Sequence, residues 1–256
     1  HIPLRRQRQM CIRDSVYKAR DILAPGIGMG GIVPALDYLT ASNRKSLGDE
    51  VADFDSGLLN AEGRDVVVIG GGDTAMDCVR TAIRQKANSV TCLYRRDRAN
   101  MPGSQREVAN AEEEGVDFRW LSAPQAFLGD NHVRAVQAQK IHLGQPDATG
   151  RQVPQIIEDS SHEIPADLVI KALGFDPEDI PTMFGAPELE VSKWGTIGVD
   201  WRTMMTNLPG VFAAGDIVRG ASLVVWGVRD GRDAAESIHS YIMAQSEAPR
   251  VAAAGA

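Results

Sequence analysis

The amino-acid sequence predicts an α/β protein built on a parallel sheet. Two observations support this class. Short apolar runs with the length of buried strands alternate with segments of helical periodicity. In addition, the stretch "VVVIGGGDTAMD" (66–77) joins one such apolar run through three glycines directly to a helical segment. With 256 residues, 43% of them hydrophobic, the chain can form one large domain or two small ones around a buried core.

The composition excludes several classes of protein. A net charge of −7 argues against a general nucleic-acid or anionic-membrane binder, and no apolar run approaches the roughly 18 residues of a membrane span. Three separated cysteines are too few for an iron–sulfur cluster and fit a reducing compartment, and the five histidines show no metal-binding spacing. We therefore expect a soluble cytoplasmic protein that binds neither nucleic acid nor membrane and has no metal site.

Residues 1–15 ("HIPLRRQRQMCIRDS") differ from the rest of the sequence. They contain four arginines and lack both an initiator methionine and the apolar core of a signal peptide. We interpret them as a non-native cloning remnant in front of a truncated gene, with a genuine basic arm as the alternative, and exclude them from the fold prediction.

The next elements lead to a β-α-β unit. Residues 31–43 predict a short helix with Pro34 in its first turn and one apolar face, formed by Ile32, Leu36 and Leu39. Residues 66–69 are too short and too continuously apolar for an amphipathic helix, so they predict a buried parallel strand. A helix follows the glycines, and residues 89–96 ("SVTCLYRR") predict a second strand, which a crossover of this length allows to be parallel. The buried stripe of that helix consists of Ala75, Val79, Ala82 and Ile83.

A further helix and strand continue the α/β pattern. Ser104 and Glu107 match a capping box, in which the serine caps the helix and the glutamate reaches back. The helix ends at Gly115, and residues 116–120 predict the third strand.

The last part of the chain predicts a β-ribbon, two strands and a closing helix. Residues 132–143 and 151–159 flank a turn-rich stretch, which favours a ribbon over another crossover. Residues 166–177 predict a buried strand that ends in a turn, and residues 208–216 predict a strand that runs into Gly215 and Asp216. The closing helix should bury one face, formed by Ala234, Ile238, Tyr241 and Ile242.

The glycine turn fits the dinucleotide-binding pattern G-x-G-x-x-G/A. Gly70 would allow the tight turn, Gly72 would let the backbone approach a pyrophosphate, and Ala75 would let the helix pack closely on the strand. The helix N-terminus would offer N–H groups to the phosphates. The alternative is a glycine-rich turn that binds nothing, but the strand before it and the helix after it favour dinucleotide binding.

The residues after the second strand favour NADP(H) over NAD(H). An NAD site usually places a carboxylate there to bind the ribose 2′-hydroxyl, about 20 residues after the glycines. This chain has Arg95 and Arg96 at that place, followed by Asp97 and Arg98. Guanidinium groups can bind a 2′-phosphate that a carboxylate would repel. A solvated basic strand end that binds nothing is the alternative.

A second Gly-Asp pair suggests a further ligand site. Asp216 follows an apolar run and Gly215, so it would lie at the carboxyl end of a strand, where α/β sheets bind ligands. An ordinary turn or helix-cap aspartate is the alternative at this position.

Two stretches together carry a resemblance to a known family. They are "VVVIGGGDTAMDCVRTAIRQKANSVTCLYRRDRANMPGSQREVANAEEEGVDF" (66–118) and "VFAAGDIVRGASLVVWGVRDGRDAA" (211–235). Within a resemblance that covers most of residues 17–243, they are similar to the small (beta) subunit of NADPH-dependent glutamate synthase. That family has the two-dinucleotide-binding flavoprotein fold, in which a Rossmann-like NADPH-binding domain is inserted into an FAD-binding domain.

The resemblance implies a function for each part of the chain. Residues 16–48 would be a remainder of the FAD domain with its connection, 49–174 the NADPH domain, and 175–256 the C-terminal part of the FAD domain. NADPH would reduce FAD, and electrons would pass through iron–sulfur clusters to the glutamate synthase large subunit, which makes glutamate. The family's first FAD-binding glycine motif and its cysteine clusters do not occur in this sequence. We therefore expect a C-terminal fragment with an incomplete FAD site, which binds NADPH and fails to retain FAD; 4Fe-4S clusters would belong to the missing part.

The resemblance also implies binding residues but no acid–base catalyst, because hydride transfer between two cofactors needs mainly positioning. The pyrophosphate of NADPH would meet Gly70, Gly71, Gly72, Asp73, Thr74 and Ala75, and its 2′-phosphate would meet Arg95, Arg96 and Arg98. Gly174 would mark the hinge between the domains. FAD would meet Gly215 and Asp216, and the last helix would bring its N-terminus to the flavin ring with Leu223, Val224 and Val225.

Two other classes stay open. One is a related flavoprotein of the same build, of the ferredoxin:NADP oxidoreductase or dihydropyrimidine dehydrogenase type. The other is a non-catalytic NADP-binding module, against which the second Gly-Asp motif argues.

Overall fold

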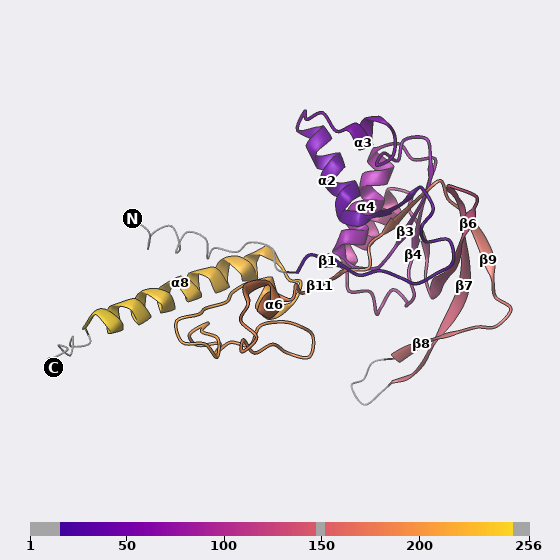
Figure 1. Ribbon diagram of the computed structural model, residues 1–256. Coiled ribbons are helices and arrows are strands. Elements are labelled where there is room, and N and C mark those ends of the chain that lie inside the picture. Colours follow the sequence, from indigo (N-terminus) through magenta and orange to yellow (C-terminus); the bar gives the residue numbers. More distant parts are fainter. Residues whose placement is uncertain (1–15, 147–151, 248–256) are drawn as a thin grey trace. The chain divides into compact units, whose positions relative to one another are not determined.

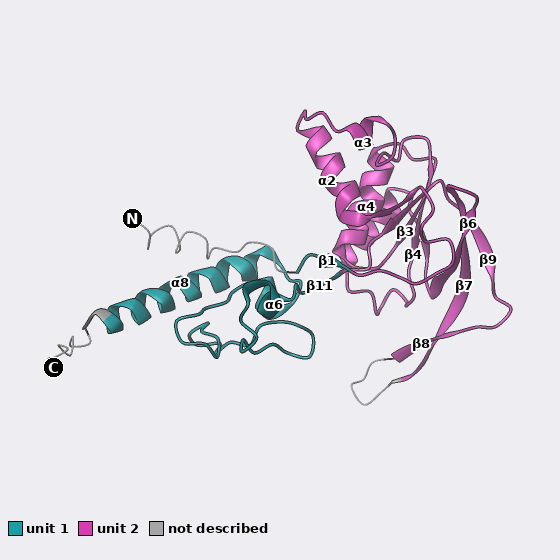
Figure 2. Ribbon diagram, in the orientation of Figure 1, with its two compact units in different colours: residues 1–19, 175–256 teal, residues 20–174 magenta. Residues whose placement is uncertain are grey.

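The computed structural model describes residues 16–146 and 152–247 of the chain. It divides into two compact units, Arg20–Gly174 and a unit formed by His1–Ala19 with Phe175–Ala256 (Figure 2). The unit that contains the glycine turn thus begins at Arg20, whereas the NADPH domain expected from the sequence begins at residue 49. The interpretation of residues 1–15 as a cloning remnant lies outside the described residues.

The unit Arg20–Gly174 is built on a parallel sheet of five strands, in the order β2-β10-β3-β4-β5. Figure 1 labels its strands β3 and β4. All four strand pairs are parallel, and Val67 lies opposite both Val169 and Thr91. The predicted strands at 66–69, 89–96, 116–120 and 166–177 are therefore confirmed. The strands are β2 (Ile32–Pro34), β3 (Asp65–Ile69), β4 (Ser89–Leu93), β5 (Asp117–Arg119) and β10 (Leu168–Lys171).

Helices cover one face of this sheet. The side chains of Val66 and Val68 point to that face and join a core that includes Val79 of α4 and Val108 of α5. Both helices expected near these residues are present. The helices of the unit are α2 (Ala35–Ser46), α3 (Ala52–Asp55), α4 (Asp73–Arg84) and α5 (Gln105–Glu113).

Two local predictions in this layer are wrong. Ile32 is in strand β2, and Pro34 ends that strand instead of lying in the helix, so α2 buries Ala35, Tyr38 and Ala41. The ring of Tyr38 is buried, and its hydroxyl donates to Gln85 Oε1 at 2.9 Å.

The predicted capping box at the start of α5 is also absent. Ser104 does precede α5, but its side chain makes no capping hydrogen bond. Glu107 pairs with Arg80 of α4 instead of reaching back to the Ser104 backbone. A long-range ion pair therefore replaces the local contact that the sequence pattern suggested.

An antiparallel sheet covers the other face. Val67 and Ile69 of β3 alternate with the residues that face the helices, so they pack against Phe127 and Val136 of this second sheet. The predicted ribbon corresponds to β7 (Val133–Pro146) and β8 (Gln152–Ile156), whose turn lies outside the described residues. The structure adds β6 (Ser122–Gly129) and β9 (His162–Pro165), which both pair with β7.

The other unit contains little sheet. Strands β1 (Lys18–Ala19) and β11 (Phe175–Asp176) pair in it, together with α6 (Ile180–Phe184), α7 (Asp216–Arg219) and α8 (Val224–Glu247). The predicted strand at 208–216 is wrong: the segment makes only an isolated bridge, between Met205 and Phe212. Gly210 and Gly215 have positive φ angles of 78° and 81°, which a continuous strand does not allow.

The closing helix α8 is confirmed, but only part of its predicted buried face is buried. Ala234 is buried, whereas Ile238 and Ile242 are exposed. No helix in the described ranges is long and apolar enough to cross a membrane.

Candidate functional site

The three glycines between β3 and α4 have three different environments. Gly70 has a φ of 153°, and a Cβ on it would lie 2.2 Å from the Ala172 carbonyl oxygen. A Cβ on Gly71 would lie 2.3 Å from the ring of Tyr94. Around Gly72, by contrast, a Cβ would meet no described atom within 4 Å. The first two glycines therefore allow close packing within the protein, and only Gly72 presents bare backbone to open space.

The N-terminus of α4 lies directly at this open space. Gly72 is the N-cap residue and provides no side chain to cap the helix. Its carbonyl oxygen accepts from the N–H groups of Ala75 and Met76 at 2.9 and 3.2 Å, which leaves the N–H groups of Asp73 and Thr74 without an acceptor within the helix. Ala75 is fully buried, as close packing of α4 on the sheet requires. An anion fits this combination of bare backbone and positive helix end.

The arginines after β4 are not equivalent. Arg95 is exposed, and no hydrogen bond or ion pair of its guanidinium occurs within 16–146 and 152–247. Arg96 donates to the Gln152 carbonyl oxygen at a long 3.4 Å. Arg98 forms an ion pair with Glu112 of α5 at 2.9 Å. Arg95 and Arg96 are therefore available to an anionic ligand, whereas Arg98 is already paired.

Asp97 lies among these arginines, yet it is occupied locally. Its Oδ1 accepts from both the backbone N–H and the side-chain amide of Asn100, each at 2.8 Å. The carboxylate thus closes a turn of its own segment. One of its two oxygens is therefore used within the segment.

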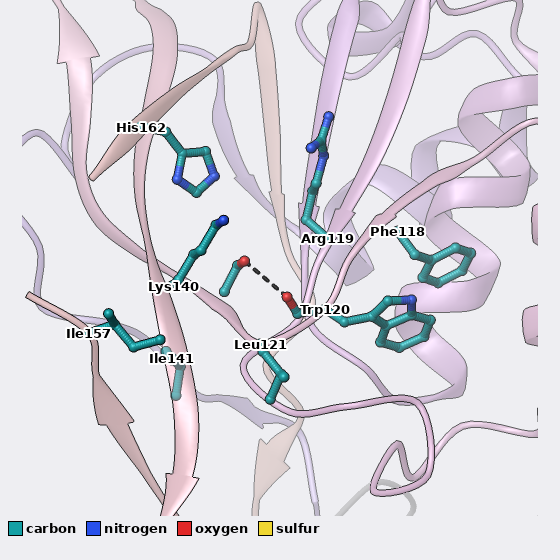
Figure 3. Close-up of a pocket in the computed structure, with 9 residues that line it drawn as sticks. Phe118, Arg119, Trp120, Leu121, Lys140, Ile141, Ile157 and His162 are labelled. Atoms are coloured by element: carbon teal, nitrogen blue, oxygen red, sulfur yellow. Dashed lines mark hydrogen bonds between the residues drawn. The ribbon is translucent and has the colours of Figure 1, made fainter. Parts of the chain in front are cut away.

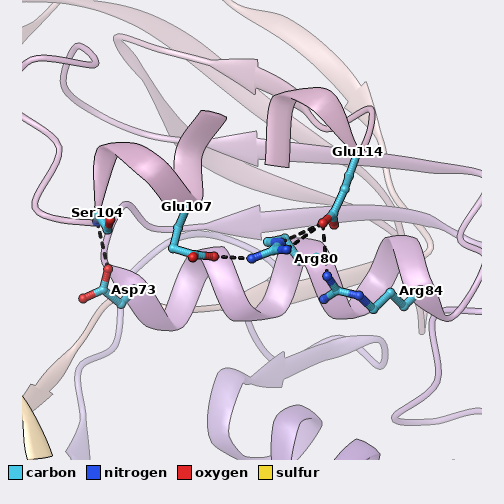
Figure 4. A network of polar contacts seen from close by, with 6 residues as sticks. All are labelled: Asp73, Arg80, Arg84, Ser104, Glu107 and Glu114. Atoms are coloured by element: carbon cyan, nitrogen blue, oxygen red, sulfur yellow. Dashed lines mark hydrogen bonds and ion pairs between the residues drawn. The ribbon is translucent and has the colours of Figure 1, made fainter. Parts of the chain in front are cut away.

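Asp73 also has a partner within the chain. Its Oδ1 accepts from the backbone N–H of Ser104 at 2.9 Å, on the side of α4 that faces α5 (Figure 4). No local sequence pattern indicates this contact, because the two residues lie 31 positions apart.

An ion-pair network fixes α5 against α4 (Figure 4). Arg80 contacts Glu107 and donates to Glu114 at 2.7 and 3.0 Å, and Arg84 lies 3.0 Å from Glu114. The hydrogen bond from Arg80 holds the pKa of Glu114 below its ordinary value, in spite of desolvation. The network acts on the helices and involves none of the predicted site residues.

The other unit holds the second group of predicted residues. Gly215, with a φ of 81°, is the N-cap of α7, and Asp216 is the first residue of that helix. Leu223, Val224 and Val225 at the start of α8 are 60%, 84% and 65% exposed. Consecutive apolar side chains with this much exposed surface can be covered by a ligand or by another segment.

A buried ion pair, which no sequence pattern indicated, supports the turn at Gly215. Asp230 of α8 is 1% exposed and accepts from two nitrogens of Arg219 at 2.6 and 2.8 Å. Arg219 holds the pKa of Asp230 below its ordinary value, and the N–H of Gly215 contributes as well. The Arg219 guanidinium also lies over the rings of Trp201 and Trp226.

Gly174 ends the unit Arg20–Gly174 with a φ of 86°. Its carbonyl oxygen accepts from the N–H of Arg20, the first residue of the same unit, at 3.0 Å. The two chain connections between the units therefore start from adjacent points of this unit.

A concavity of about 460 Å³ lies elsewhere in the unit Arg20–Gly174 (Figure 3). It is bounded by residues 118–122, by Lys140 and Ile141 of β7, and by Ile157 and His162. None of the predicted site residues lines it. In the described parts of the chain, no three His, Cys, Asp or Glu side chains are grouped so that they could hold a metal ion.

A parallel sheet in which one strand leads through glycines into a helix is the arrangement of dinucleotide-binding α/β proteins. Residues 19–248 match the family described as pyridine nucleotide-disulphide oxidoreductase, and the chain belongs to this family. It is 66% identical over 250 residues to the glutamate synthase [NADPH] small chain of Azospirillum brasilense, covering 98% of this chain and 52% of that protein. It is 43% identical over 218 residues to the protein of the same name from Escherichia coli, covering 83% and 46%. The chain thus spans about half the length of these curated relatives.

Solved structures of low identity share the fold. FprA of Mycobacterium tuberculosis, solved in complex with NADPH, superimposes with a TM-score of 0.70 at 16% identity, over 91% of this chain and 63% of FprA. Thioredoxin reductase of Lactococcus lactis gives 0.63 at 23% identity, over 89% and 64%. The predicted two-dinucleotide-binding flavoprotein fold is therefore confirmed.

Proposed function

We propose that this chain binds NADPH between the glycine turn and the arginines after β4, and that it belongs to an NADPH-dependent flavoprotein oxidoreductase. One observation carries the proposal. The ends of two neighbouring parallel strands, β3 and β4, present the bare backbone of Gly72 and the exposed guanidinium of Arg95, which has no ion-pair partner among the described residues. A dinucleotide with a 2′-phosphate has two anionic groups, and each of these features suits one of them.

The preference for NADPH over NADH follows from the charges at the end of β4. Arg95 and Arg96 would contact the 2′-phosphate, and Arg98 would contribute less because Glu112 already neutralises it. The Oδ1 of Asp97 accepts two hydrogen bonds from Asn100, which hold this carboxylate against its own segment. Gly70, Gly71, Thr74 and Ala75 would form the turn around the pyrophosphate, with its oxygens at the first N–H groups of α4.

The flavin site is proposed in the other unit. When both cofactors are bound, NADPH supplies a hydride that FAD accepts. Gly215 and Asp216 would contact the ribityl and phosphate part of FAD. The N–H groups at the start of α8, around Leu223, Val224 and Val225, would lie at the flavin ring, where the positive helix end stabilises negative charge. Gly174 would act as the hinge between the units.

The high identity to glutamate synthase small chains supports a more specific proposal. The chain would be part of such a small subunit in the cytoplasm, delivering electrons through 4Fe-4S clusters to a large subunit that makes glutamate. In this proposal, residues 49–174 form the NADPH domain, and 16–48 and 175–256 belong to the FAD domain.

The test compares binding of NADPH and NADH to the purified chain by isothermal titration calorimetry. Replacing Arg95 and Arg96 together by alanine should weaken NADPH at least about tenfold, since charge-assisted hydrogen bonds are lost, and should leave NADH almost unchanged. The matched control is Arg98→Ala, which should have a smaller effect. Equal losses for both nucleotides in the double variant would contradict the 2′-phosphate assignment.

A further inference from the structure

The segment 94–104, which carries the arginines, is fastened to the glycine turn at its far end. The N–H of Gly103 donates to the Gly71 carbonyl oxygen at 3.0 Å, and the N–H of Ser104 donates to the Asp73 carboxylate at 2.9 Å. The first of these bonds joins backbone to backbone. The second depends on one side chain, Asp73, and that side chain is shown beside Ser104 in Figure 4.

The near end of the segment is fixed to the same turn. The ring of Tyr94 occupies the place where a Cβ of Gly71 would lie, and its hydroxyl donates to the Asn100 carbonyl oxygen at 3.2 Å. Within the segment, Asp97 holds Asn100, and the N–H of Met101 donates to the Arg98 carbonyl oxygen at 3.2 Å. The segment is therefore a closed loop, and Arg95 and Arg96 lie between its two attachments to the glycine turn.

The Asp73 carboxylate is a poor partner for a pyrophosphate, because two negative charges repel each other. As the first residue of α4 it does interact favourably with the positive end of the helix. Its bond to Ser104 directs it toward the start of α5, whereas the open space lies at Gly72. The structure thus directs the Asp73 carboxylate away from the open space, while its backbone N–H stays among the groups at the start of α4 that suit a phosphate.

We propose that Asp73 is a positioning residue for nucleotide specificity: by accepting from the Ser104 N–H, it holds the loop 94–104 so that Arg95 and Arg96 stay at a fixed distance from the glycine turn. This inference rests on the proposed function. The glycine turn serves the pyrophosphate that NADPH and NADH share, while the arginines serve the 2′-phosphate that only NADPH has. A loosened loop therefore weakens NADPH and spares NADH.

The experiment uses two replacements at position 73 in the 256-residue chain. Asp73→Asn keeps an oxygen that can accept from Ser104, and Asp73→Ala removes it. Calorimetry with NADPH and with NADH measures both dissociation constants. We expect Asp73→Ala to weaken NADPH about tenfold, the effect of losing one hydrogen bond to a charged group, with NADH changed less than twofold. Asp73→Asn should keep most of the preference for NADPH.

A matched control and a direct measurement of the loop complete the test. Asp179→Ala removes a comparable bond, from the Thr182 N–H to the Asp179 carboxylate at 3.3 Å in the other unit, and should leave both dissociation constants unchanged. Hydrogen exchange should show faster exchange of peptides covering residues 98–104 in Asp73→Ala, with the wild-type rate largely restored in Asp73→Asn.

Three results would overturn the inference. They are equal losses of NADPH and NADH in Asp73→Ala, an Asp73→Asn variant as impaired as the alanine variant, or unchanged exchange of the loop in Asp73→Ala. A wild-type chain without any preference for NADPH would instead contradict the proposed function. In that case the exchange experiment still decides whether Asp73 holds the loop, so the two failures are distinguishable.

Discussion

Replacing Gly72 by serine should separate cofactor binding from folding. The backbone of Gly72 has φ −91° and ψ 178°, an extended conformation that any residue adopts, and a Cβ there meets no described atom within 4 Å. Serine is also preferred over glycine at a helix N-cap, where its hydroxyl can accept from a first-turn N–H. The free energy of unfolding should therefore stay unchanged or rise by a few tenths of a kcal/mol.

The same side chain would occupy the space proposed for the pyrophosphate. Forcing an extra group into a well-packed contact costs about 1–3 kcal/mol, which corresponds to a dissociation constant about 5 to 150 times higher. The serine hydroxyl would also compete with the phosphate for the N–H groups of α4. Because both nucleotides contain the pyrophosphate, NADPH and NADH should be weakened equally, unlike in the arginine variants.

Gly71→Ala is the matched control with the opposite outcome. A Cβ on Gly71 lies 2.3 Å from the Tyr94 ring, so the ring must move and the loop 94–104 with it. Overpacking of this kind lowers the free energy of unfolding by about 1–3 kcal/mol. The adjacent glycines should therefore differ, with Gly71→Ala unstable and Gly72→Ser stable.

Thermal unfolding monitored by circular dichroism and calorimetric titration with both nucleotides measure these effects. A Gly72→Ser chain that melts like the wild type and still binds NADPH with wild-type affinity would contradict this prediction. The open space at Gly72 would then not be where the cofactor lies.

Two further predictions concern the cores of the two units. Arg219→Met leaves the buried Asp230 carboxylate without its partner and should lower the melting temperature by several degrees. Adding Asp230→Asn to the same chain should partly restore the melting temperature. An unchanged melting temperature in Arg219→Met would show that the pair does not stabilise the fold. Because the folded-state pKa of Asp230 lies below its ordinary 3.8, the pair's contribution is present above about pH 4 and disappears as the pH falls through that lowered pKa, and this acid dependence should be weaker in Asp230→Asn. Burial raises the pKa of Cys92 to about 12 and also raises that of Cys78, so neither thiol should react with a disulfide reagent at pH 8 until the chain unfolds. The assay needs a Cys11→Ser background, and rapid labelling of the folded chain would contradict this packing.

Local patterns predicted the elements whose physics is local. The apolar run before the glycines forms β3, and the segment with a helical apolar stripe after them forms α4. Both were predictable because strand burial and helix amphipathicity follow from the pattern of apolar residues within a short segment. The same reasoning failed for residues 208–216, where an apolar run has only an isolated bridge to pair with. It also missed β6 and β9, whose pairing with β7 depends on residues distant in the chain.

The α/β class, the glycine turn and the cluster of arginines after the second strand could be predicted from the sequence alone, since each depends on residue types at short spacing. Which of these charged side chains are available to a ligand depends on the packing of the folded chain. Packing of α5 beside α4 pairs Arg98 with Glu112, directs Glu107 to Arg80, and places Ser104 where Asp73 can hold it. Such pairs join residues up to 31 positions apart. Sequence spacing does not predict them, because the two side chains come within hydrogen-bond distance only when the chain folds.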